Sequence, residues 1–484
     1  MRRLLPRLPA AAWMCALIAL LNATAWSLIT PPFEGKDEVD HFAYVEQLAE
    51  TGALPSGSGR DDEYSPEESL VMEGIDYYGV RFVPHSPAIS TAAEQRTLIN
   101  DVNAGKSRIG TGGAGIATSE PPLYYALQTI PYELASGNML TALQLMRLVG
   151  AVFGAMTALF TFLFLREILP RPPWAATVGA LCVALQPLLA FMSGSVNPES
   201  MLYAVAAATL YCLARAFSRG LSGRLAVVLG LLIAIGFLTK LNFVGFALGV
   251  YAGLAALAVR DVRSGGRGAL WRPALAAGTG MVPVALYALR NVLAGQAAFG
   301  IVSGIVDQLT KSFSNELSYV WELYLPRLPG MAHYFVGMAT FKDVWFDRSV
   351  GLYGWMDTTF PAWVDNLAIV PAAILALLCG RELFARRHDL RPRLLELGVY
   401  AVTTLGVLVM IGATSYGSDV IVHEAAFGEP RYLLPLVPLL GAVVALAVRG
   451  AGRRWAPVAG AAVVVLFLGH DIFSQLQVIG RYYG

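Results

Sequence analysis

Long apolar runs recur from one end of the chain to the other, separated by shorter polar segments. Most of these runs hold roughly 18 residues or more, enough for an α-helix to cross a hydrocarbon core of about 30 Å. The pattern therefore predicts an all-α polytopic membrane protein with eleven spans. The predicted spans are residues 10–30, 142–165, 173–193, 197–217, 223–239, 241–259, 272–290, 363–380, 394–413, 431–448 and 456–475.

The charges between the runs orient these spans. In the eleven-span arrangement, 20 of the 35 basic residues fall in loops on one side. Loops on the cytoplasmic side of a membrane are enriched in lysine and arginine, so that side is the cytoplasm. We expect a multi-pass protein of a bacterial inner membrane, with its N-terminus inside and its C-terminus outside.

Two apolar segments allow a second interpretation. The first run has a basic start and the small residues Ala23 and Ala25, as a cleaved signal peptide would. It continues to Pro31, however, which favours an uncleaved span. Residues 121–135 could form a twelfth span, but that would place the later arginine clusters outside. The segment is also short and broken by Pro131, so we expect a re-entrant or juxtamembrane helix on the outer side.

Two long loops face outward in this arrangement. The first, residues 31–141, holds 17 Asp or Glu against 6 Lys or Arg, and the second, residues 291–362, is rich in aromatic side chains. Loops of this length are usually functional rather than mere connectors. We expect a single transmembrane domain over residues 1–484, with both loops carrying juxtamembrane helices.

Composition agrees with a membrane protein and excludes several other classes. Only 14% of residues are charged, against about 25% in soluble domains, and mean hydropathy is +0.56. The outward loop is acidic, which argues against a nucleic-acid partner. The four cysteines all lie inside apolar runs and show no metal-binding spacing.

The most informative polar motif follows the first span. A helical pattern begins at Asp37 and ends at Gly52, and it places Asp37, Glu38, His41 and Tyr44 along one face. Carboxylates at a helix N-terminus can simply complement the helix dipole. Carboxylates at the outer mouth of a membrane bundle also mark substrate paths, so a catalytic role is the alternative.

Five further motifs lie at outer span ends or in the loops. Each has an ordinary structural explanation: a helix start, a turn, a lysine extending to the interface, an aromatic belt, or an arginine binding a lipid headgroup. Each could equally bind a sugar or a phosphate. Their candidate residues are Glu120, Tyr124 and Tyr125; Asn197 and Glu199; Lys240; Trp355 and Asp357; and Arg431 and Tyr432.

Taken in order, the six motifs resemble a known family. They run DE-x-x-H, PP-x-YY, NP-E, LTK, GW-x-DT and RY-x-x-P over roughly residues 20–445. This order resembles the polytopic family labelled domain of unknown function 2142, predicted membrane glycosyltransferases, and the wider GT-C superfamily. The resemblance implies a GT-C-like bundle of about 11 helices whose outer loops form a lid.

The resemblance also implies a function and assigns roles. The protein would move a sugar, as a hexosyl- or pentosyltransferase, from a polyprenyl-phosphate donor to an extracytoplasmic glycan, lipid or protein. Asp37 would be the general base, with Glu38 as second choice. The predicted topology, rather than the resemblance, indicates the phosphate site: Arg431, with Lys240 and as a third choice Arg290, lies at an outer span end, where the headgroup of a polyprenyl phosphate must sit. The remaining substrate-binding candidates are His41, Tyr44, Glu120, Tyr124, Tyr125, Asn197, Glu199, Trp355, Asp357 and Tyr432.

Three questions stay open at this point. A divalent cation, Mg or Mn, could sit on Asp37, Glu38 and His41, although three ligands on one helical turn are weak evidence. A transporter of lipid-linked glycans is an alternative, but it would need charges at the membrane midplane. A polysaccharide polymerase or ligase shares the same lipid-linked substrate and is the third possibility.

Overall fold

The computed structural model describes residues 8–56, 64–83, 90–110, 114–263, 270–295, 297–299, 313–334, 341–417 and 429–484. Within these ranges the chain is almost entirely helical, and β1 (Leu352–Tyr353) and β2 (Thr358–Thr359) form a two-stranded antiparallel hairpin. The predicted all-α polytopic class is confirmed.

Eight helical segments of the described chain are long and apolar enough to cross a membrane. A bent pair, α8 (Pro173–Ala184) and α9 (Pro187–Ser193), counts as a ninth if it is one span, with 59° between its halves. The eight segments are α1 (Ala10–Ile29), α7 (Met139–Ile168), α10 (Pro198–Arg219), α12 (Phe243–Arg263), α17 (Ala362–Ala385), α18 to α19 (Arg387–Tyr416), η6 with α20 (Pro430–Gly450) and α21 (Ala456–Tyr483).

The two remaining predicted spans correspond to α11 (Gly223–Thr239) and α13 (Trp271–Leu293), which pack against each other. At 1.5 Å per residue, the 17 residues of α11 reach about 26 Å, slightly less than a typical hydrocarbon core. The count of eleven therefore stays a prediction.

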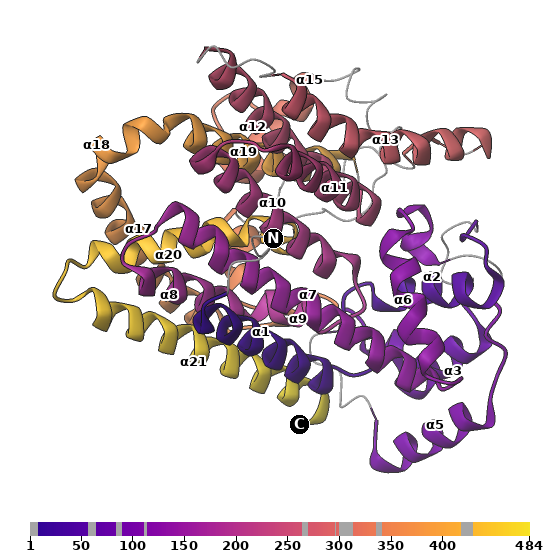
Figure 1. The fold of residues 1–484 in the computed structure, drawn as a ribbon. Coiled ribbons are helices and arrows are strands. Elements are labelled where there is room, and N and C mark those ends of the chain that lie inside the picture. The colour runs from indigo at the N-terminus through magenta and orange to yellow at the C-terminus, as the bar shows by residue number, and fades with distance from the viewer. Residues whose placement is uncertain are drawn as a thin grey trace.

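The spans pack in two groups with the first loop at one end (Figure 1). One group holds α1, α7, α8, α17, α20 and α21, and the other holds α11, α12, α13 and α19, with α10 packed between them. The first loop contributes α2 (Glu38–Thr51), α3 (Pro66–Gly74), α4 (Tyr77–Val80), α5 (Ala92–Ala104), η2 (Gly115–Ser119) and α6 (Leu123–Leu134).

The predicted helix after the first span is confirmed closely. Helix α2 is preceded by Asp37 as its N-cap and ends at Gly52, whose φ of 67° suits a residue without a Cβ. Residues 121–135 contain the 12-residue helix α6, which is too short to be a span and packs on α2 and α7.

The second loop contributes α15 (Phe313–Tyr324), η3 (Asp343–Asp347), α16 (Arg348–Val350) and the hairpin. The short helices α18 (Arg387–Leu390) and η4 (Arg391–Arg393) precede α19 (Leu394–Tyr416), and η6 (Pro430–Leu436) precedes α20 (Val437–Gly450).

Candidate active site

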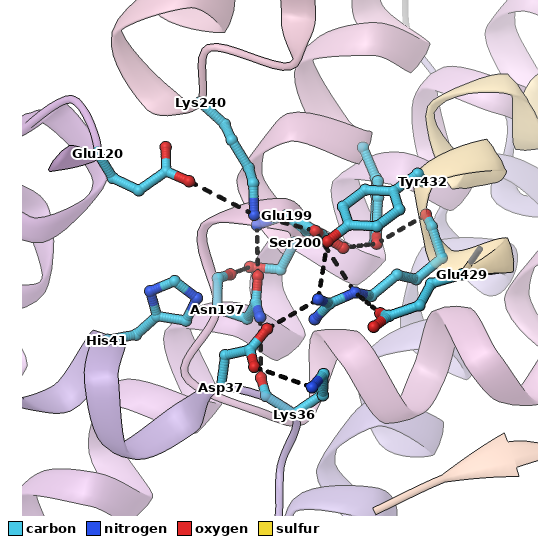
Figure 2. A network of polar contacts seen from close by, with 12 residues as sticks. Lys36, Asp37, His41, Glu120, Asn197, Glu199, Ser200, Lys240, Glu429 and Tyr432 are labelled. Atoms are coloured by element: carbon cyan, nitrogen blue, oxygen red, sulfur yellow. Dashed lines mark hydrogen bonds and ion pairs between the residues drawn. The ribbon is translucent and has the colours of Figure 1, made fainter. Parts of the chain in front are cut away.

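The polar side chains of four motifs converge where several helices begin or end. Asp37 occupies the N-cap position of α2 without a side-chain capping bond, Glu199 lies in the first turn of α10, Lys240 follows α11, and Arg431 lies in η6. Helix N-termini favour carboxylates and C-termini favour cations, so the local position of Glu199 and Lys240 suits their charge. Figure 2 shows the side chains of Asp37, Glu199, Lys240 and Glu429 pointing toward one another.

Arg431 is the centre of this network. Its Nη2 donates to Asp37 Oδ2 at 2.7 Å, and its Nε lies 2.5 Å from Glu429 Oε2 and 3.8 Å from Glu199 Oε1. The residue is only 5% exposed, yet its Nη1 has no hydrogen-bond partner. A buried guanidinium nitrogen that is left unpaired is costly, so this nitrogen is available to a ligand.

Lys240 lies between two carboxylates. Its Nζ donates to Glu199 Oε1 at 3.0 Å and lies 3.8 Å from Glu120 Oε1 (Figure 2). Burial raises the pKa of Glu120, despite the nearby lysine. The other oxygen of Glu199 accepts from Tyr203 at 2.7 Å, so this carboxylate is held from both sides.

Asp37 is buried rather than open to solvent. We expected it at an accessible mouth, but it is 4% exposed, because Arg431 and Lys36 cover both oxygens. Burial by itself raises the pKa of Asp37, but Arg431 and Lys36 outweigh it and hold that pKa well below its usual range. Its backbone has a φ of 59°, a left-handed conformation that is strained for a non-glycine residue and is often found at functional sites.

Asn197 joins the motifs through the backbone. Its Oδ1 accepts from the Glu199 amide at 3.0 Å, which caps α10, and its Nδ2 donates to the Lys36 carbonyl at 3.1 Å. One side chain therefore holds the start of α10 against the turn that carries Asp37.

His41 lies beside the network with one nitrogen unpaired. Its Nδ1 is 2.9 Å from Tyr125 Oη, whereas its buried Nε2 has no partner. Burial, and then the positive charge of Lys240, lowers the pKa of His41 to about 3. The ring is therefore neutral and can bind a ligand through Nε2. Tyr44 stacks on Tyr125 with ring centroids 3.7 Å apart.

Glu38, the second choice for the base, points elsewhere. Its side chain is fully buried against Arg147, whose Nε donates to Glu38 Oε1 at 2.8 Å. The same oxygen accepts from the Val196 amide at 2.8 Å. We did not predict a role for Arg147 from the sequence, although an arginine inside an apolar run indicates a buried partner.

Four other predicted residues make no hydrogen bond or ion pair with Arg431 or Asp37 that the structure describes, although the Trp355 ring lies against Lys36. Trp355 is 1% exposed and donates to the Phe33 carbonyl at 3.0 Å, and Asp357 lies 3.8 Å from Arg481 of α21. Tyr124 accepts from Gln128 at 2.8 Å. Arg290 is exposed at the end of α13 and bonds Asn291 at 3.0 Å.

Glu429 was also not predicted as a site residue, although it is close in sequence to Arg431.

Among the residues that the structure describes, no three His, Cys, Asp or Glu side chains gather closely enough to hold a metal ion. The Mg or Mn site stays a prediction.

Two pockets adjoin Arg431 and share only this residue. The α10–α12–α19 pocket is a narrow pocket between these three helices and η6. Its polar end is formed by Glu199, Tyr203, Lys240, Asn242, Arg431 and Tyr432, and its apolar walls are Leu202, Phe243, Phe246, Val407, Met410 and Pro435.

The α9–hairpin pocket lies against Lys36 and Glu429 as well as Arg431. Its other walls are Leu188, Phe191, Met192, Leu352, Gly354, Met356 and Pro430. Asp37 contacts Lys36 with one oxygen and Arg431 with the other, so it touches residues of both pockets.

Two solved structures are similar to this chain at low sequence identity. The oligosaccharyltransferase of Archaeoglobus fulgidus, tethered to an acceptor peptide, is 12% identical with a TM-score of 0.43, over 97% of this chain and 55% of that one. The chain thus spans about half the length of that enzyme. ArnT from Cupriavidus metallidurans, bound to undecaprenyl phosphate, is 15% identical with a TM-score of 0.44, over 98% of this chain and 75% of that one.

The sequence itself places the chain in a family. No curated protein matches it. A family model described as a predicted membrane protein, DUF2142, matches residues 20–440. This match covers most of the chain and agrees with the resemblance seen in the six motifs, so the protein belongs to the DUF2142 family of membrane proteins.

Proposed function

We propose that this protein is a membrane glycosyltransferase of the GT-C type. It takes a sugar from a polyprenyl-phosphate donor and transfers it to a glycan, lipid or protein acceptor outside the cytoplasm of a bacterium. The donor phosphate binds at Arg431 and Lys240, and Asp37 activates the acceptor.

The observation that carries this proposal is the form of the α10–α12–α19 pocket. One end presents Arg431, with its unpaired Nη1, and Lys240. The other walls are apolar side chains from α10, α12 and α19, all of which are long and apolar enough to cross a membrane. Such a pocket suits an amphiphile with an anionic head and a hydrocarbon tail, as a polyprenyl phosphate is.

The reaction needs three events at this place. The acceptor oxygen forms a bond to the anomeric carbon, and its proton passes to Asp37. The bond from the anomeric carbon to the phosphate oxygen breaks, and its electron pair stays with the phosphate. Cations must stabilise the negative charge that develops there.

Arg431 links the proton transfer to the departure of the phosphate. Its Nη2 is paired with Asp37. When Asp37 accepts the proton it loses its charge, and the guanidinium is freed to stabilise the leaving phosphate. Negative charge thereby moves from one side of Arg431 to the other, while the total charge of the site is unchanged.

Purified protein tests the proposal directly. It should be incubated in bilayers with a panel of polyprenyl-phosphate sugars and candidate envelope acceptors, and the products analysed by mass spectrometry. Transfer, or slow release of polyprenyl phosphate to water, is expected for at least one donor. A protein that consumes no member of a broad donor panel would contradict the proposal.

One observation favours a transporter of lipid-linked glycans instead. The bent pair α8 and α9 is a broken helix next to the site, as transporters often have. The described charged network, however, lies at helix ends rather than along a path through the bundle. A vesicle assay that shows the lipid-linked glycan crossing the bilayer unchanged would support the transporter.

A further inference from the structure

The charges around Arg431 limit how much anion the site can accept. Three cations, Lys36, Lys240 and Arg431, face four carboxylates of the described chain: Asp37, Glu120, Glu199 and Glu429. Even without Glu120, whose pKa is raised by burial, three carboxylates face these three cations. The donor therefore enters a site whose positive charge is already balanced.

Glu199 occupies the place between the two cations that would hold a phosphate. Its Oε1 is 3.0 Å from Lys240 Nζ and 3.8 Å from Arg431 Nε. The carboxylate cannot swing away easily, because Tyr203 donates to its other oxygen at 2.7 Å and it is 1% exposed. An incoming anion must therefore share these cations with Glu199.

Few donors remain for the incoming anion. Two buried nitrogen atoms beside the network have no hydrogen-bond partner, Arg431 Nη1 and His41 Nε2. The histidine nitrogen can donate in the tautomer that carries its proton on Nε2. Lys240 can add its charge from the rim of the pocket. These groups suit the oxygens of one phosphate, whereas a second phosphate would add charge next to Glu199 and Glu429 with no further cation.

We propose that this site accepts a donor with a single phosphate, and that Glu199 excludes lipid diphosphates by holding Lys240 and Arg431. The inference rests on the proposed function and makes it more specific, since lipid-linked sugars occur with one phosphate or with two. Glu199 acts here as a specificity-determining residue.

Two unreactive probes test this. Farnesyl methyl phosphate carries one negative charge, and farnesyl methyl diphosphate carries two. Their dissociation constants would be measured on the purified full-length protein in detergent. Wild type should bind the monophosphate at least about tenfold more tightly, because the second charge meets carboxylates rather than cations. Equal or tighter binding of the diphosphate would overturn the inference and leave the proposed function standing.

The variant Glu199→Gln tests the assigned residue. Removing one negative charge should strengthen diphosphate binding more than monophosphate binding and reduce the tenfold preference to about twofold or less. An unchanged preference would refute the role of Glu199. The wild-type comparison remains decisive even if this variant folds poorly.

Glu396→Gln is the matched control. Glu396 is likewise buried, accepts from a tyrosine four residues on, Tyr400, at 2.7 Å, and pairs with a cation, Arg393. It does not line the pocket, so its substitution should leave both dissociation constants unchanged. If wild type bound neither probe, the proposed function itself would fail, and the inference with it.

Discussion

Two neighbouring carboxylates, Asp37 and Glu38, each bind an arginine from a distant part of the chain. Glu38 binds Arg147, whose guanidinium also donates to the carbonyls of Ser27, Thr30 and Pro31 at 2.7–2.9 Å. That arginine therefore joins the end of α1 to the start of α2. Asp37 binds Arg431, which keeps one nitrogen unpaired and lies at two pockets.

The difference teaches how to separate a structural ion pair from a binding one. Arg147 satisfies the carbonyls that the end of a helix leaves without partners, so its bonds are complete inside the protein. Arg431 is equally buried but incomplete, and a buried unsatisfied donor indicates a ligand. The comparison predicts that the first pair stabilises the fold and the second serves the reaction.

The largest expected effect is on stability. Glu38→Gln leaves the charge of Arg147 buried without a counter-ion, which should lower the free energy of unfolding by about 3–5 kcal/mol. Glu167→Gln is the control, because Glu167 pairs with Arg219, whose side chain is 61% exposed, and should cost less than about 1 kcal/mol. Unfolding in denaturing detergent measures both. An equal loss of unfolding free energy in the two variants would contradict a structural role for the Glu38–Arg147 pair.

The second effect is on the reaction. Asp37→Asn removes the proposed base and should lower kcat by about 10²-fold or more. The fold should persist better than in Glu38→Gln, since Arg431 still has Glu429 at 2.5 Å and Glu199 at 3.8 Å. Turnover and thermal unfolding would be measured on the same preparations. Wild-type turnover by Asp37→Asn would leave this carboxylate with only a structural role, as the ion-pair partner of Arg431 and Lys36.

The third effect concerns pH and His41. Its pKa is lowered from 6.5 to about 3 in the folded protein, so below pH 6.5 the unfolded chain binds a proton that the folded chain does not. Stability is therefore lost as pH falls from 6.5 toward 3. Between pH 6.5 and 5 this one group should cost about 2 kcal/mol.

The variant His41→Gln isolates that contribution. The free energy of unfolding of wild type should fall by more than that of the variant over the same pH interval. Parallel pH profiles for the two proteins would mean that the imidazole is not held neutral.

The smallest expected effect compares the two cations that are proposed to bind the donor phosphate, Arg431 and Lys240. Arg431→Lys keeps the charge but loses the planar pair of donors, so kcat/KM for the donor should fall by about tenfold. Lys240→Ala should show the same pattern more weakly, with use of the acceptor little changed in both. If Arg431→Lys used the donor as well as wild type, Arg431 would be better explained as an interface residue.

The motifs in the sequence predicted which residue types would gather at helix ends, but not which residues they would contact. Asp37 and Arg431 are 394 positions apart, and only the folding of the whole chain brings them within hydrogen-bond distance. Polar residues in apolar surroundings were informative: Asn197, Glu199 and Lys240 were all found in this way. Glu429 adjoins a recognised motif, yet its contact with Arg431 depends on the fold.

Aromatic residues were harder to interpret from the chain. Trp355 lies in a loop, where a sugar-stacking role was predicted, but its ring is buried under Arg81 and Lys36, with its nitrogen on Phe33. A tryptophan in a loop has the same sequence signature whether it is covered or open. The helical pattern predicted the start and end of α2 to within one residue, because the signals that begin and end a helix are local in the sequence. Whether a loop residue is buried depends instead on segments far away in the sequence.

The central claim is that Arg431 marks the head of a pocket for a lipid phosphate. A farnesyl phosphate with a photoreactive diazirine at its tail end tests it most directly, with the labelled residues identified by mass spectrometry. The account predicts labelling on the apolar walls, at Leu202, Phe246, Val407 or Met410, and loss of that labelling in Arg431→Ala. Labelling confined to other helix faces, or undiminished in Arg431→Ala, would contradict it.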